Sequence, residues 1–109
     1  MIARTWRGWT TRSDADAYVS YLKETGQPES LGTPGNRGFA ILRRDDGDRT
    51  EFVTISLWDS FEAIEAFAGP GGKVVFYPED DRFLIEREPF ITHFEVASGK
   101  LSLDADEDA

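Results

Sequence analysis

The stretch that most constrains the fold is Phe52–Gly69, FVTISLWDSFEAIEAFAG, which predicts a strand that runs directly into a helix. The β-branched and aromatic residues of its first part are typical of a strand, and their alternation produces two unlike faces. One face is aliphatic, with Val53, Ile55 and Leu57, and the other is mixed, with Phe52, Thr54, Ser56 and Trp58. We expect the aliphatic face to be covered by the following helix and the mixed face to remain uncovered by helices.

The helix that follows is predicted to begin after Asp59 and to end at Gly69. Asp59 can cap its first turn, and Glu62 three residues later completes a capping-box pattern. Apolar residues then recur with helical spacing, at Phe61, Ile64, Phe67 and Ala68. A glycine after the last of them is a common stop signal.

The remaining elements follow from alternation, helical periodicity and the positions of glycine and proline. We expect strands at 2–9, 39–44 and 89–97, and a hairpin turn at 45–48. A first helix of about 12 residues is predicted from an N-cap at Ser13 to Gly26. The segment 27–38 is expected to be irregular, as a lid or a crossing loop, and a short helix is expected to start at 77–81.

This order predicts an α+β, ferredoxin-like βαββαβ fold, with a four-stranded antiparallel sheet covered on one face by two helices. Residues 1–97 form the domain, and the acidic tail 98–109 is expected to be flexible. The uncovered sheet face is too aromatic to face water if it holds the residues expected there: Arg4, Trp6, Phe52, Thr54, Ser56, Trp58, Ile91 and His93. Pairing of two such faces in a homodimer predicts a dimeric α+β barrel.

Composition excludes several classes of function. The chain of 109 residues has a net charge of -9, which disfavours nucleic acid and anionic membranes as partners. It has no cysteine and one histidine, so disulfides, thiolate catalysis and a cysteine-ligated metal are excluded, and we expect no metal site. No apolar stretch is long enough to span a membrane or resembles a signal peptide, so a cytoplasmic location is expected.

Four segments together resemble one known family: IARTWRG near the start, PGNRGFAILRR, LWDSFEAIEAF and YPEDDRFLIEREPFITHFEV. Over residues 2–97 they are similar to the antibiotic biosynthesis monooxygenase-like family of dimeric α+β barrel proteins. The resemblance implies oxidation of aromatic phenols to quinones without a cofactor, or haem degradation. It also includes members that have no assigned reaction.

The resemblance carries over to individual residues only in part. In the haem-degrading branch an Asn lies on the first strand, a Trp ends the third, and a His follows the second main helix. Trp58 matches the Trp, whereas Trp6 or Arg7 stands at the Asn position and 73–77 contains no His. In the quinone-forming branch the matched strand has Asn and Trp four residues apart, where this chain has Thr54 and Trp58. The resemblance therefore disfavours haem degradation.

The candidate site combines aromatic, cationic and proton-transferring side chains. Trp58 and Trp6 are expected to hold an aromatic ring, with Thr54 beside them, although packing in a dimer core is an equally open interpretation for Trp58. His93 is the candidate base or oxyanion partner, because its pKa lies near neutrality. Arg4 would stabilise negative charge and Tyr77 would donate to a substrate oxygen. The hypothesis is a monooxygenase that uses no cofactor; the alternatives are a dimeric binding protein and a purely structural dimer.

Overall fold

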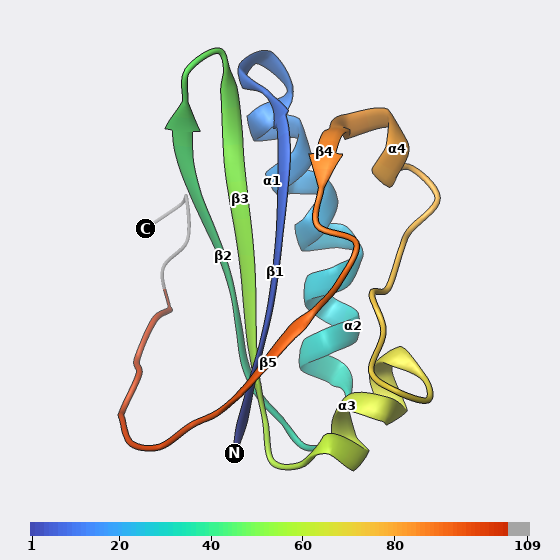
Figure 1. Ribbon diagram of the computed structural model, residues 1–109, viewed down its shortest axis with the longest axis vertical. Helices are drawn as coiled ribbons and strands as arrows, with labels where there is room; N and C mark the ends of the chain where they lie inside the picture. The colour runs from blue at the N-terminus through green and yellow to red at the C-terminus, as the bar shows by residue number, and fades with distance from the viewer. Residues whose placement is uncertain (105–109) are drawn as a thin grey trace.

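The computed structural model describes residues 1–104, which form one sheet with helices on one side of it (Figure 1). The elements follow one another in this order: β1 (Ile2–Thr11), η1 (Arg12–Asp14), α1 (Ala15–Glu24), α2 (Gly26–Gly32), β2 (Asn36–Asp46), β3 (Arg49–Trp58), α3 (Phe61–Ala68), α4 (Asp80–Phe83), β4 (Leu84–Arg87) and β5 (Thr92–Glu95). The predicted ferredoxin-like α+β architecture is confirmed. The acidic end of the tail, 105–109, lies outside the described residues.

The sheet is antiparallel throughout, in the order β2-β3-β1-β4, with β5 also paired to β1. β5 pairs with Ile2–Thr5 and β4 with Gly8–Thr10, so the two short strands share one edge of β1. The single final strand predicted at 89–97 was therefore wrong in extent. Pro89 lies in the gap between these two strands, where a residue without a backbone N–H cannot continue a ladder.

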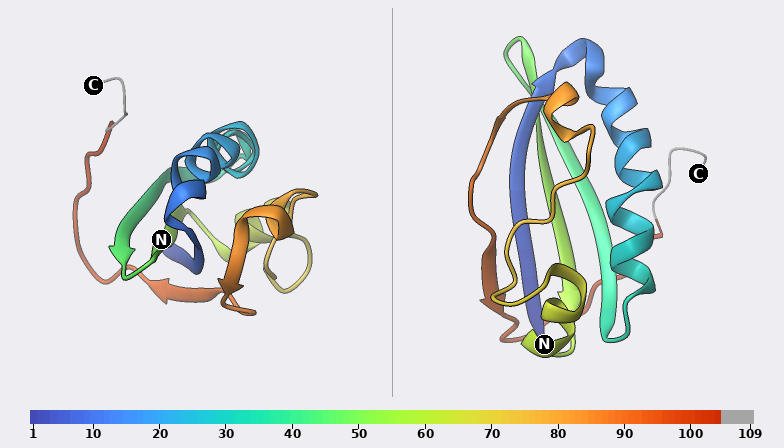
Figure 2. Two further views of the ribbon diagram at one scale, coloured as in Figure 1. Left: turned by 90° about the horizontal axis from the view of Figure 1, so that it is seen from above. Right: turned by 90° about the vertical axis from the view of Figure 1, so that its right-hand side faces the viewer.

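All the helices lie on one side of the sheet, as the view from above shows (Figure 2). The side that they cover is the mixed face of β3. Tyr18 from α1 packs edge-on against Phe52, with ring centroids 5.0 Å apart, and Tyr18 also contacts Phe83, at 5.6 Å. The prediction that the aliphatic face would be covered was wrong. The largest side chains of β3, Phe52 and Trp58, are both fully buried on the helical side.

The opposite face of the sheet carries the aliphatic residues and has no helix over it. We call this surface the open face; it contains Ala3, Ala40, Leu42, Val53, Ile55, Leu57 and Phe94. At one end of it, Glu51 is buried between Arg7 and Arg44, which approach its carboxylate to 3.5 and 2.8 Å. The open face is thus apolar along its length and ionic at one end.

Three local expectations also needed correction. The segment 27–38 is not irregular throughout: α2 occupies Gly26–Gly32, because Pro28 lies in the first turn, where no helical N–H is lost. Ser60, rather than Asp59, caps α3 by accepting a hydrogen bond from the Ala63 N–H at 3.2 Å. Thr11, rather than Ser13, caps the first helical turn by accepting from the Asp14 N–H.

The remaining elements agree with the pattern of the sequence. β2 and β3 form the predicted hairpin, with Gly47 at φ 66° in its tight turn. The tail is without regular secondary structure over 98–104. Among the described residues, no helix is both long and apolar enough to cross a membrane.

Candidate functional site

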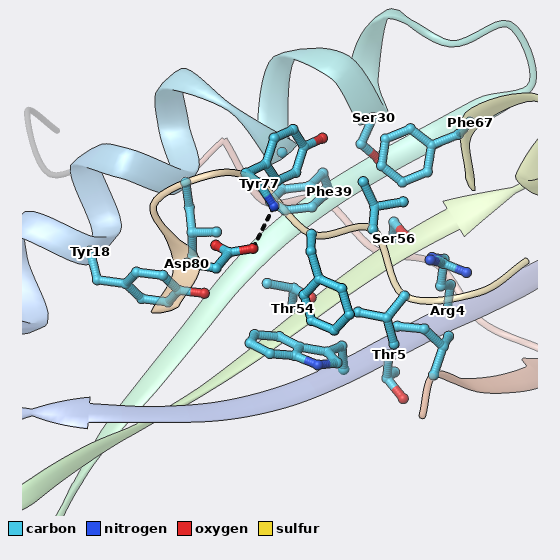
Figure 3. Close-up of a pocket in the computed structure, with 17 residues that line it drawn as sticks. Arg4, Thr5, Tyr18, Ser30, Phe39, Thr54, Ser56, Phe67, Tyr77 and Asp80 are labelled. Atoms are coloured by element: carbon cyan, nitrogen blue, oxygen red, sulfur yellow. Dashed lines mark hydrogen bonds between the residues drawn. The ribbon is translucent and has the colours of Figure 1, made fainter. Parts of the chain in front are cut away.

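A cavity of about 80 Å³ lies between the helix-covered face of the sheet and the segment Val74–Tyr77 (Figure 3). Its walls come from β1, β2 and β3 on one side and from the helices and the 74–77 segment on the other. Its lining is mostly apolar and aromatic: Trp6, Tyr18, Leu22, Phe39, Phe67, Val74, Val75, Phe76, Tyr77 and Ile91. Polar groups enter it from Arg4, Ser30, Thr54, Ser56 and Asp80. An apolar pocket with a few polar groups is the usual form of a small-molecule site.

Arg4 places a buried positive charge at one end of this cavity. The residue is only 5% exposed, and its guanidinium donates to the carbonyl oxygens of Gly72 at 2.7 Å and Lys73 at 2.6 Å. Burial lowers the pKa of Arg4 to about 10, so the group remains cationic at neutral pH. Within residues 1–104, no carboxylate forms an ion pair with it. Among the described residues, the charge is therefore compensated by dipoles and by the face of the Phe67 ring, whose centroid is 5.9 Å from the guanidinium carbon.

His93 lies beside Arg4 and does not line the cavity. Its Nε2 is 3.1 Å from an Arg4 guanidinium nitrogen, and because the guanidinium can only donate, Nε2 accepts and Nδ1 carries the proton. Burial, followed by the positive charge of Arg4, lowers the pKa of His93. The imidazole is thus held in its neutral form, and it makes an edge-to-face contact with the Phe61 ring, with centroids 5.2 Å apart.

The two tryptophans of the expected platform occupy different positions. Trp6 lines the cavity, and its indole N–H donates to the Glu88 carbonyl oxygen at 3.1 Å. Trp58 is fully buried behind the wall, where it stacks on Phe67 with centroids 5.5 Å apart. The Trp58 N–H donates to Ser56 Oγ at 2.8 Å. In this structure Trp58 supports the wall through Phe67 and Ser56 and does not itself reach the cavity.

Thr54 and Tyr77 both line the cavity. The hydroxyl of Tyr77, however, donates outward to Glu29 Oε2 at 2.5 Å. Burial, together with this carboxylate, raises the pKa of Tyr77. Tyr77 therefore presents its ring to the cavity, while its hydroxyl ties the 74–77 segment to α2.

Two polar residues that sequence reasoning missed lie at the end of the cavity away from Arg4, as Figure 3 shows: Tyr18 and Asp80. Asp80 is 6% exposed, and its carboxylate accepts from the Tyr77 N–H at 2.7 Å. Desolvation, opposed by that hydrogen bond and by Arg87, raises the pKa of Asp80. Tyr18 is 1% exposed, and its hydroxyl has no hydrogen-bond partner among residues 1–104. Burial raises the pKa of Tyr18 as well.

The segment from Gly69 to Tyr77 closes the cavity without forming a helix or strand. Gly72 adopts a φ of 60°, and a Cβ at this position would lie 3.1 Å from both Ile64 and Phe61. Glycine is required here because the backbone must pass this close to α3 in a left-handed conformation. The close approach brings the carbonyls of Gly72 and Lys73 within reach of Arg4.

No cluster of three or more metal-ligating side chains occurs in the described part of the chain. The polar features of the cavity are thus a guanidinium at one end and a carboxyl with a phenol at the other. These groups can bind an anionic oxygen, move a proton and hold a ring between aromatic walls.

Comparison with known proteins places the chain in a family. The family model described as antibiotic biosynthesis monooxygenase matches residues 6–69, which is more than half of the chain. No curated protein gives a significant match.

Several solved structures share the fold at low sequence identity. A protein from Nitrosomonas europaea with the same family description has a TM-score of 0.68 and 16% identity, covering 90% of this chain and 100% of that one. SnoaB, a cofactor-independent oxygenase from Streptomyces nogalater, has a TM-score of 0.56 and 20% identity, covering 95% and 98%. The haem-degrading MhuD of Mycobacterium tuberculosis, with two haems bound, has a TM-score of 0.57 and 18% identity, covering 92% and 99%.

At these identities the structural likeness establishes the fold, whereas the family model rests on the sequence itself. The matched residues contain β2, β3, α1, α2 and α3, which supply part of the cavity wall. The chain belongs to the antibiotic biosynthesis monooxygenase family.

Proposed function

We propose that the protein is an oxygenase that acts on a small hydroxylated aromatic molecule without a cofactor. The observation that carries this proposal is the buried guanidinium of Arg4 in the wall of an aromatic cavity, with no carboxylate paired to it among the described residues. A buried charge without a counter-ion is costly, and an anionic oxygen of a ligand would offset that cost. The description of SnoaB as a cofactor-independent oxygenase supports the same class of reaction.

The chemistry needs an electron-rich aromatic anion and molecular oxygen. Loss of the hydroxyl proton gives a phenolate, which passes electrons to O2. One oxygen atom of O2 becomes a new carbonyl in place of a ring C–H, and the other leaves as water. The four electrons lost when a phenol becomes a quinone equal the four that O2 accepts, so no external reductant is required.

In this proposal, two of the residues expected at the site serve the anionic end and a third serves the ring. Arg4 uses three of its five N–H donors on Gly72, Lys73 and His93, which leaves two for a ligand. His93 accepts from Arg4 and so fixes the plane of the guanidinium, which is the role of an oxyanion partner. Trp6 supplies the apolar wall against which a ring packs.

Entry of a ring requires the cavity to widen. Its volume of about 80 Å³ is below the roughly 150 Å³ that accommodates benzene in an engineered protein core. The longest part of the described wall without regular secondary structure is the segment ending at Tyr77, and the Arg4 hydrogen bonds hold it closed. A ligand anion that competes for Arg4 would release this segment outward.

The disfavoured haem reaction gains no support from this geometry. The single histidine of the chain has its Nε2 turned to Arg4, and its Nδ1 carries a proton, so neither nitrogen is presented to the cavity. A macrocycle is also much larger than the cavity of about 80 Å³.

A homodimer is part of the same proposal. The open face is apolar over four strands, and burial against a second copy would remove Leu42, Ile55 and Phe94 from water. The sequence predicted that the mixed face would form the dimer interface. Because the helices cover that face, the proposed interface is the aliphatic open face. The cavity, on the other side of the sheet, would remain accessible in such a dimer.

The proposal is tested by oxygen uptake with a panel of mono-, di- and polycyclic phenols. We expect uptake with at least one of them, and a loss of about 100-fold or more in kcat/KM for Arg4→Gln, as for truncation of one partner of a buried charge pair. The matched control is Arg37→Gln, since Arg37 is a surface arginine paired with Asp59 at 2.6 Å; this variant should retain full activity.

Two outcomes would contradict the proposal. One is the absence of uptake with every phenol in the panel. The other is unchanged kinetics in Arg4→Gln. Quenching of tryptophan fluorescence by a phenol that is not turned over would identify a binding protein instead, because Trp6 lines the cavity.

A further inference from the structure

The end of the cavity away from Arg4 carries a hydrogen-bond donor and an acceptor that the proposed function does not use. Tyr18 comes from α1 and Asp80 from the start of α4, and both side chains reach the same region of the wall (Figure 3). Each is more than nine-tenths buried. These two residues are separated by most of the domain in sequence, so only the fold brings them together.

Tyr18 is the donor of this pair. Its ring is fixed by Phe52 and Phe83, which leave the hydroxyl facing the cavity. Tyr18 lines the cavity, so a ligand in the cavity can reach its hydroxyl. Because no partner occurs among residues 1–104, a ligand atom that accepts a hydrogen bond would satisfy it.

Asp80 is the acceptor. One of its oxygens, Oδ2, is held by the Tyr77 N–H, which leaves Oδ1 for another donor. The other charged groups around it are Arg87 on β4, which attracts, and Asp81, which repels, while Tyr18 and Tyr21 of α1 face it as phenols. Its burial makes the carboxylate a stronger base than an exposed aspartate, as the direction of its pKa shift shows.

A hydroxyl group is the simple ligand function that both accepts from Tyr18 and donates to Asp80. At the opposite end, Arg4 requires an anionic oxygen that binds through two N–H groups, for which a carboxylate has the matching shape. Between these two ends the walls are aromatic, from Trp6, Phe39 and Phe67. Because the cavity of about 80 Å³ must already widen to admit one ring, a single-ring ligand requires the least displacement of the wall.

We propose that the substrate is a single-ring hydroxy-aromatic acid, bound with its carboxylate at Arg4 and its hydroxyl between Tyr18 and Asp80, and that Asp80 accepts the hydroxyl proton. This assignment rests on the proposed function for its chemistry. Asp80 takes the proton as the phenolate forms, and O2 oxidises the ring at the carbon beside the hydroxyl. The proton on Asp80 and the proton of that ring carbon both leave in water, so the product is the ortho-quinone.

Binding is measured by calorimetry, because it reports on recognition whether or not turnover occurs. The probes are 4-hydroxybenzoate, 4-hydroxyphenylacetate and 3-(4-hydroxyphenyl)propanoate, which differ in length. Benzoate, phenol and 4-methoxybenzoate each lack one recognised feature. We expect at least one of the three hydroxy acids to bind about tenfold or more tightly than each control, the size of a hydrogen bond to a charged group.

The variants separate the two ends of the cavity. Tyr18→Phe keeps the ring that packs on Phe52, and Asp80→Asn keeps an acceptor for the Tyr77 N–H, so both should fold. Either variant should reduce the preference for the hydroxy acid over benzoate to within about threefold, while Arg4→Gln should abolish the preference for the acid over phenol. In addition, Asp80→Asn should lower the rate of oxygen uptake by about 100-fold or more, as expected for loss of a general base.

Separate results bear on the substrate assignment and on the reaction. If a hydroxy acid binds selectively but no oxygen is consumed, the ligand assignment is supported. In that case the role of Asp80 as a base and the oxygenase function are both wrong. Uptake with phenols but no preference for the carboxylate or the hydroxyl would overturn this inference and leave the oxygenase standing. If none of the six compounds bound, the inference would be wrong.

Discussion

Arg4 has the least usual environment of any side chain in the cavity wall. Its guanidinium is removed from water, yet its visible partners are two carbonyl oxygens, a neutral imidazole and the face of Phe67, at 5.9 Å from the ring centroid. Dipoles and a ring face compensate a buried charge less completely than a carboxylate does. The buried charge therefore destabilises the protein when the site is empty and favours the binding of an anion at the site.

The ionisation of His93 gives a direct test of this local field. Its pKa is lowered by burial and by Arg4, so we expect its NMR titration midpoint to lie below the ordinary value of about 6.5. Arg4→Gln should move the midpoint part of the way back, because burial remains after the charge is removed. The assignment is unambiguous because the chain has one histidine.

The lowered pKa of His93 also predicts how the free energy of unfolding depends on pH. Because the folded state holds His93 neutral, acidification protonates the unfolded chain first, and the free energy of unfolding should fall as the pH drops below about 6.5. His93→Gln should lose less stability over that interval in urea titrations. A midpoint above 6.5, or an equal loss in both proteins, would contradict the neutral, Arg4-bound imidazole.

Residue-scale prediction from sequence succeeded where alternation along a strand was the signal. Arg4, Trp6 and Thr54 share one face of the sheet in the prediction and in the structure, and all three line the cavity. Tyr18 and Asp80 were missed because each already had a structural explanation, as a core residue of a helix stripe and as an acid in a first helical turn. Nothing in the spacing of these residues indicates that they meet.

At the scale of elements, the start of α3 distinguishes two capping residues that are adjacent in sequence. Ser60 Oγ accepts from Ala63 N, whereas the Asp59 carboxylate is turned outward to Arg37. We expect Ser60→Ala to lower the free energy of unfolding by about 1 kcal/mol, as for other N-cap serines. Asp59→Ala should have a smaller effect in the same urea titration, because it removes only a surface ion pair. The reverse order would show that Asp59 is the cap.

The assignment of faces on β3 could not be made from the sequence. Alternation shows that two faces differ, but it does not say which of them the helices cover when both are largely apolar. Thr54 and Ser56 made the mixed face look less suited to helix packing than the aliphatic face. In the structure Ser56 accepts from the Trp58 N–H and Thr54 lines the cavity, so both are accommodated under the helices. Strand positions were predicted well, whereas β4 was missed because Leu84–Arg87 is short and follows directly on α4.

At the scale of the whole molecule, the open face determines the expected assembly. Leu42 on this face and Leu31 on α2 are equally exposed, at 49%, so an aspartate at either position should affect the monomer similarly. We expect Leu42→Asp to dissociate the homodimer at micromolar concentrations and Leu31→Asp to leave it intact, as measured by sedimentation velocity. A monomeric parent protein, or dissociation by both substitutions, would contradict pairing through the open face.

The central position of β1 has a consequence for the order of folding. β2 and β3 form a local hairpin, whereas every other pairing in the sheet requires β1 to be brought to partners distant in the chain. Contacts with large sequence separation carry the greatest entropic cost and slow folding. The Arg4 hydrogen bonds to Gly72 and Lys73 span 68 and 69 residues and need both sheet and loop in place. The ligand cavity is therefore completed late in folding, and its closing contacts contribute to how slowly the protein unfolds rather than to how fast it folds.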